Sequence, residues 1–88
     1  MAHRNVVIAS KVGLHARPAA LFSKAAAGSG VRVTIRKGTG DPVPAASILS
    51  VLTLNVAHGD EVVLEAEGEH AERVLDELAT LLATDHDA

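Results

Sequence analysis

The chain has 88 residues, of which 48% are hydrophobic and 22% charged, and its net charge is −3. This length predicts a single domain over residues 1–88, and the acidic balance argues against nucleic-acid binding. The absence of cysteine excludes disulfides and thiolate metal sites, and no apolar stretch approaches the roughly 18 residues of a membrane helix. We therefore expect a cytoplasmic protein without membrane insertion.

The first half of the chain predicts a strand, a helix and a second strand. Asn5–Ala9 favours a strand, and Lys11–Gly13 a turn. The Ala-rich segment Ala16–Ala27 predicts a helix that stops at Gly28, because glycine commonly ends helices. Apolar and polar residues then alternate over Val31–Arg36, which is typical of a half-buried strand.

A hairpin follows, with a short strand at the edge of the sheet. Gly38–Asp41 has the composition of a turn, and the strand around Val43 is flanked by Pro42 and Pro44. Because proline cannot donate a backbone hydrogen bond, this strand is expected at an edge.

The remaining segments complete a two-layer α+β domain. Ser47 is a candidate N-cap for a short helix over Ile48–Leu54. Glu61–Glu67 alternates as a strand, and Ala71–Ala83 carries one apolar stripe, as an amphipathic helix does. The order of elements is then strand, helix, two strands, helix, strand and helix. This order fits antiparallel strands whose one apolar face is covered by three helices.

The segment most informative about chemistry is Gly13–Ala20. If a helix starts at His15, Pro18 falls in the first turn, where its missing N–H costs little. The N–H groups of Ala16 and Arg17 then point out of the positive helix end, which is a favourable place for phosphate. The Arg17 guanidinium suits phosphate oxygens, and both groups favour a neutral, nucleophilic His15.

Ordinary structural roles account for many such residues. A histidine before a helix is often a cap or a surface residue, and an arginine there is often solvated. Metal binding is not indicated, because the other histidines lack paired ligand spacing. These residues are His3, His58, His70 and His86.

The Gly13–Ala19 segment resembles the active-site signature of the HPr family, the phosphocarriers of the bacterial sugar phosphotransferase system. The likeness extends along nearly the whole chain. Phe22 and Lys24 fit the helix after the site, Ala45–Leu49 fits a second signature, and Thr53–Asp60 fits the turn into the last strand.

The resemblance implies an open-faced β-sandwich, in which three helices cover one face of a four-stranded antiparallel sheet of order 1-4-2-3. It implies a carrier rather than an enzyme, without metal or other cofactor. His15 would accept the phosphoryl group on Nδ1 from phospho-Enzyme I, with help from Arg17, and donate it to sugar-specific IIA domains.

The resemblance also implies a regulatory role for Ser47, which a dedicated kinase phosphorylates in some relatives. Two departures weaken that implication. Ala46 stands where relatives often have Lys, and the preceding hairpin is one residue longer. The simpler role of Ser47 is the helix cap, and both roles are compatible because a phosphate would also sit at a helix start.

The resemblance also implies a docking surface for Enzyme I and IIA domains beside the site. Apolar residues spaced three and four apart on a helix, as in Ile48–Leu52, more usually face the core. Val51 and Leu54 would be the buried pair. The expected contacts are Ala16, Arg17, Ala20, Ile48, Leu49 and Leu52, with Ser47 at the rim. A monomer is expected, because partners need this face open.

Two further departures leave the proposed chemistry intact. Asn55 replaces the usual glycine and predicts a left-handed helix terminus, and Val12 replaces a small polar residue. Three alternatives remain. They are a regulatory protein-docking module, a carrier in a nitrogen-linked phosphotransferase branch, and an α+β domain that binds a small anion without covalent transfer.

Overall fold

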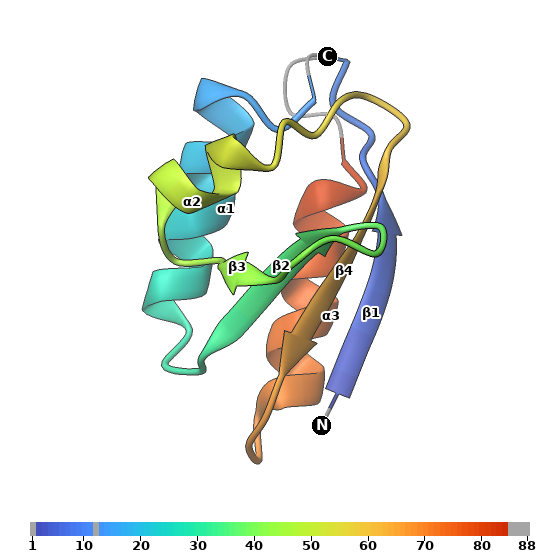
Figure 1. Cartoon of the computed structure of the whole chain (residues 1–88). Coiled ribbons are helices and arrows are strands. Elements are labelled where there is room, and N and C mark those ends of the chain that lie inside the picture. Colours follow the sequence, from blue (N-terminus) through green and yellow to red (C-terminus); the bar gives the residue numbers. More distant parts are fainter. Residues whose placement is uncertain (1, 12, 85–88) are drawn as a thin grey trace.

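A computed structural model describes residues 2–11 and 13–84. The four strands form one antiparallel sheet of order β1-β4-β2-β3, and the helices lie on the same side of it (Figure 1). This confirms the fold expected from the sequence. In chain order the elements are β1 (Ala2–Val7), α1 (Ala16–Gly28), β2 (Val33–Lys37), β3 (Val43–Pro44), α2 (Ile48–Thr53), β4 (Glu61–Ala66) and α3 (Ala71–Leu82).

The core lies between the sheet and the helices, as the alternation of the strands predicted. Inward residues of the central strands, such as Ile35 and Leu64, are fully buried, together with Phe22 of α1 and Leu75 of α3. Val63 differs from the expected pattern, because it points to the open face yet is only 7% exposed. Its pairing partners are Asn5 and Arg36, which flank it on the two neighbouring strands.

The first strand lies earlier in the chain than the sequence indicated. It pairs with β4 from Ala2, opposite Ala66, to Val7, opposite Glu61. Beyond Val7 the Ile8 backbone still bonds to Gly59 and Asp60, and the Ala9 N–H then donates to the Leu82 carbonyl at the end of α3 at 3.2 Å. The apolar run Val6–Ala9 therefore extends beyond the end of β1, because the residues after Val7 pack against α3.

An ion-pair cluster ties β1 to α3. The Arg4 Nε atom donates to Asp76 at 2.8 Å, and its Nη2 atom donates to Glu72 at 2.5 Å. These bonds stand on the surface, where such pairs contribute little to stability.

The edge strand β3 has the form that its prolines predicted. It spans two residues, and Pro44 lies opposite Thr34 of β2. In the part of the chain described, no helix has both the length and the apolar character needed to span a bilayer.

Candidate functional site

His15 stands at the start of α1 with its side chain exposed. Its backbone is extended, with φ −94° and ψ −165°, and its carbonyl accepts the Ala19 N–H at 2.8 Å. The imidazole makes no capping hydrogen bond to the helix. The backbone of His15 thus initiates the helix while the ring remains accessible to another protein.

The first turn of α1 is arranged for a negative charge. The N–H groups at the start of an α-helix point out of its end, because no preceding turn supplies carbonyl groups for them. Pro18 is buried in this turn, and the turn carries no acidic residue. Arg17 is exposed beside His15. Backbone dipole and guanidinium therefore place positive charge at the same helix end.

His70 provides a comparison within the same molecule. It is the exposed N-cap residue of α3, and its ring also makes no capping hydrogen bond. The first turn of α3, however, contains Glu72, whose carboxylate opposes a second anion. Of these two helix starts, the one at His15 is the more suitable for phosphate.

The loop before His15 is held against the segment between α2 and β4, at one end of the molecule (Figure 1). The Leu14 N–H donates to the Val56 carbonyl at 3.0 Å, and the Leu14 side chain is buried. Gly13 has φ +71°, and a Cβ there would lie 2.8 Å from the Ala57 Cα atom. Glycine is therefore required at this position, both for its backbone angle and for the close approach of the two segments.

The short helix α2 packs beside α1 and presents an apolar surface. Leu49 is 74% exposed, and Ile48 and Leu52 are each 37% exposed. Val51 is fully buried and Leu54 partly so, in agreement with the predicted burial.

The cap of α2 agrees with the sequence prediction as well. The Ser47 Oγ atom accepts the Ser50 N–H at 3.3 Å, as an N-cap does. Asn55 ends this region with φ +54°, the left-handed conformation that its sequence position predicted. The predicted effect of Val12 on the site loop falls on a residue outside those described.

One apolar residue beside the site was missed from the sequence. Leu21 is 42% exposed and lies four residues after Arg17 in α1, which places the two side chains on one helix face. That spacing was the available signal. Ala16, Arg17 and Ala20 are exposed as well.

A family model described as the PTS HPr component phosphorylation site matches residues 2–84. The chain belongs to the HPr family. It is similar to the phosphocarrier protein HPr of Streptomyces coelicolor, with 51% identity over 83 residues that cover 94% of this chain and 89% of that protein. HPr proteins carry phosphoryl groups within the phosphotransferase system, so the chain is a phosphocarrier and not an enzyme with turnover.

Solved HPr structures have the same fold. The crystal structure of HPr from Bacillus anthracis has a TM-score of 0.86 and 34% identity, covering 92% of this chain and 95% of that one. An HPr dimer from Thermoanaerobacter tengcongensis has a TM-score of 0.68 and 36% identity, covering 92% of each chain. Because an HPr structure similar to this chain is a dimer, the expected monomer stays a prediction.

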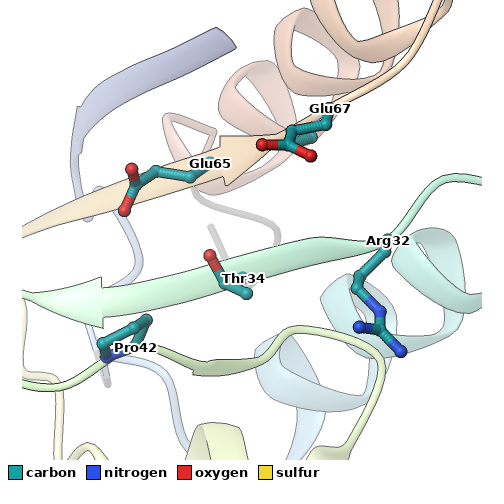
Figure 2. A pocket seen from close by; sticks show the side chains of 6 residues that line it. Arg32, Thr34, Pro42, Glu65 and Glu67 are labelled. Carbon is teal, nitrogen blue, oxygen red and sulfur yellow. The ribbon is translucent and has the colours of Figure 1, made fainter. Parts of the chain in front are cut away.

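A hollow of about 440 Å³ lies on the open face of the sheet (Figure 2). Glu65 and Glu67 extend over it from the β4 side, Thr34 from β2, and Arg32 and Pro42 from the segments beside β2 and β3. No residue of the helix start lines it, so the hollow and the start of α1 are separate features of the surface.

Metal-ligating groups do not gather in the described residues. Within 2–11 and 13–84, no cluster of three or more His, Cys, Asp or Glu side chains could hold an ion. His86, the last of the histidines considered from the sequence, falls outside these ranges.

Proposed function

We propose that His15 is the residue that carries the phosphoryl group, bound to its Nδ1 atom. In the accepting step the Nδ1 lone pair forms a P–N bond while the bond between phosphorus and phospho-Enzyme I breaks. Donation to a IIA domain reverses these roles, so the carrier ends in its starting form. The observation that supports this assignment is the exposed ring at a positive helix end within an HPr-family chain.

The Ala16 and Arg17 amides and the Arg17 guanidinium are proposed to hold the phosphoryl oxygens. A helix start carries roughly half a unit of positive charge, which favours the anion before, during and after transfer. Donors already fixed in place need no reorganisation when the P–N bond forms. The carrier itself would need neither metal nor another cofactor for this step.

Enzyme I and sugar-specific IIA domains are proposed to dock on the surface formed by α2 and the start of α1. Its members are Ala16, Arg17, Ala20, Ile48, Leu49 and Leu52, with Ser47 at the rim. Both partners must reach the same imidazole, so one shared surface serves both. The shared exposure of Ile48, Leu49 and Leu52 on one short helix supports this role, because grouped apolar side chains on a surface are typical of interaction sites.

Phosphorylation of Ser47 by a kinase is proposed as a regulatory step. A phosphate there would bring negative charge to the rim of an apolar docking surface and oppose partner binding by desolvation. The half-buried Ser47 hydroxyl serves as the cap of α2, so modification would also alter the helix start.

Labelling with phosphoenolpyruvate and Enzyme I tests the assignment of His15. The wild-type protein should acquire an acid-labile, base-stable phosphate, and His15→Ala should acquire none. His70→Ala is the matched control, because it removes an exposed N-cap histidine from another helix and should keep the label. A labelled His15→Ala protein overturns the assignment.

The choice of partners tests the branch of the pathway. Phosphorylated protein should pass its label to a IIA domain of a sugar transporter. Exchange restricted to the Enzyme I and IIA proteins of a nitrogen-linked branch would contradict the sugar assignment while leaving His15 as the carrier residue.

A further inference from the structure

Lys37, at the end of β2, bridges the two ends of the turn that precedes β4. Its Nζ atom donates to the Asn55 carbonyl at 3.0 Å and lies 3.2 Å from the Asp60 Oδ2 atom. The same carboxylate oxygen accepts the Ala57 N–H at 2.9 Å, and the Asp60 N–H returns a bond to the Ala57 carbonyl at 3.1 Å. One lysine thus fixes the start and the end of the segment 55–60.

That segment is the support on which the residues before His15 rest. The Val56 carbonyl accepts a hydrogen bond from the Leu14 N–H. The Ala57 backbone lies so close to Gly13 that a Cβ atom there would collide with it. The end of the segment is in turn bonded to Ile8, whose N–H donates to the Asp60 carbonyl at 3.0 Å. A displacement of 55–60 would therefore move the chain directly before the phosphate-accepting histidine.

The same lysine also reaches the end of the docking helix. Asn55 follows α2 in the left-handed conformation, and its N–H donates to the Leu52 carbonyl at 3.2 Å. The Asn55 carbonyl that Lys37 binds is thus part of the connection between α2 and the support of His15.

We infer that the Lys37–Asp60 ion pair positions His15 for phosphoryl transfer, by holding the segment 55–60 against Leu14 and against the end of α2. Lys37 and Asp60 are positioning residues in this scheme and touch no phosphate. The inference rests on the proposed role of His15.

The pair is better suited to positioning than to stabilising the fold. The side chains of Lys37 and Asp60 are 41% and 34% exposed, and ion pairs at such exposure add little to the free energy of unfolding. Transfer between two proteins, in contrast, depends steeply on geometry, because a small misplacement of reacting atoms slows a step greatly. The Ala57 N–H and Lys37 lower the pKa of Asp60, so its carboxylate is charged at neutral pH.

The test uses Lys37→Met, Asp60→Asn and the conservative Lys37→Arg, with Asp76→Asn as matched control. The control removes an exposed ion pair of the same kind, with Arg4, between β1 and α3. Two quantities are measured at equal protein concentration. They are the rate of phosphoryl transfer from phospho-Enzyme I, and the hydrogen exchange rate of the Leu14 amide.

Lys37→Met and Asp60→Asn should each slow transfer on the order of threefold to tenfold and speed Leu14 exchange, because both release the segment 55–60. Lys37→Arg should restore most of the rate, and Asp76→Asn should change neither quantity. The double variant should be no slower than the slower single variant, as expected for two residues that act through one contact.

Opposite effects of the two single variants on the rate would overturn the inference, because they would indicate a long-range charge effect on partner docking. Unchanged Leu14 exchange in both variants would overturn it as well. If the wild-type protein takes no label, or if His15→Ala keeps it, the proposed function fails. The Leu14 exchange rates would then still decide whether the ion pair holds the loop.

Discussion

His15 and His70 occupy equivalent places at the starts of α1 and α3, each as an exposed N-cap residue whose ring makes no capping hydrogen bond. The two helix starts differ in charge. Arg17 follows His15 by two residues, whereas Glu72 follows His70 by two residues. Under the proposed function, the sign of the neighbouring side chain is what favours phosphate at the start of α1 over the start of α3.

Replacement of Arg17 by Ala should slow phosphoryl transfer by about 10- to 100-fold, because a preorganised donor to the phosphoryl oxygens is lost. The same replacement at Arg73, in the first turn of α3, is the control and should leave the rate unchanged. Transfer rates are measured with purified phospho-Enzyme I. Equal rates for Arg17→Ala and the wild type would remove Arg17 from the site.

Replacement of Leu49 by Ser should raise the KM for Enzyme I and for the IIA domain without lowering the melting temperature, because Leu49 is exposed. Val51→Ala on the same helix should instead cost about 2 kcal/mol of folding free energy, since it leaves a cavity in the core. Steady-state transfer and urea denaturation separate the two effects. A Leu49→Ser protein with wild-type KM for both partners would contradict the docking surface.

Replacement of Gly13 by Ala should destabilise the fold by at least about 2 kcal/mol, because the new side chain meets the Ala57 backbone in a left-handed conformation. Gly28→Ala is the matched control. A Cβ at Gly28 meets nothing within 4 Å, and its φ is not positive, so alanine there should be neutral or slightly stabilising. Thermal denaturation compares the two, and equal melting temperatures would count against the tight approach at Gly13.

The stabilising effect of Asp60 should depend on pH. The Ala57 N–H, first, and Lys37, second, hold the pKa of Asp60 below its ordinary value of 3.8 in the folded protein. A carboxyl group of this kind stabilises the fold above its unfolded pKa, and the contribution is lost as the pH falls through the folded pKa.

Urea denaturation of the wild type and of Asp60→Asn checks this dependence. The difference in unfolding free energy should stay constant down to about pH 5 and then narrow under more acidic conditions. When Lys37 is replaced by Met in both proteins, the difference in unfolding free energy should vary less with pH. A difference that widens on acidification would contradict the direction of the pKa shift.

Much of the fold follows from local patterns in the sequence. The alternation in Val31–Arg36 and Glu61–Glu67 locates the central strands, and α1 extends to Gly28, close to the expected helix end. The first strand was placed too far along the chain, because its limits are set by pairing with β4, more than fifty residues away. The sheet order came from the family resemblance and not from periodicity.

The site was accessible from the sequence to a similar degree. The segment Gly13–Ala20 contains the histidine, the helix start and the arginine within a few residues, so its chemistry can be inferred locally. The contacts that support that segment cannot be inferred locally, because Lys37 lies far along the chain from its partners Asn55 and Asp60. Only the folded arrangement brings these groups together.

Under the proposed role of His15, the exposure of its ring also sets how long the protein can hold a phosphoryl group. A phosphoryl group on an exposed imidazole is open to attack by water for as long as it is bound. The lifetime of the charged carrier is then governed by the intrinsic chemistry of the P–N linkage. Such a carrier must transfer its phosphoryl group to a partner protein before the P–N bond is hydrolysed.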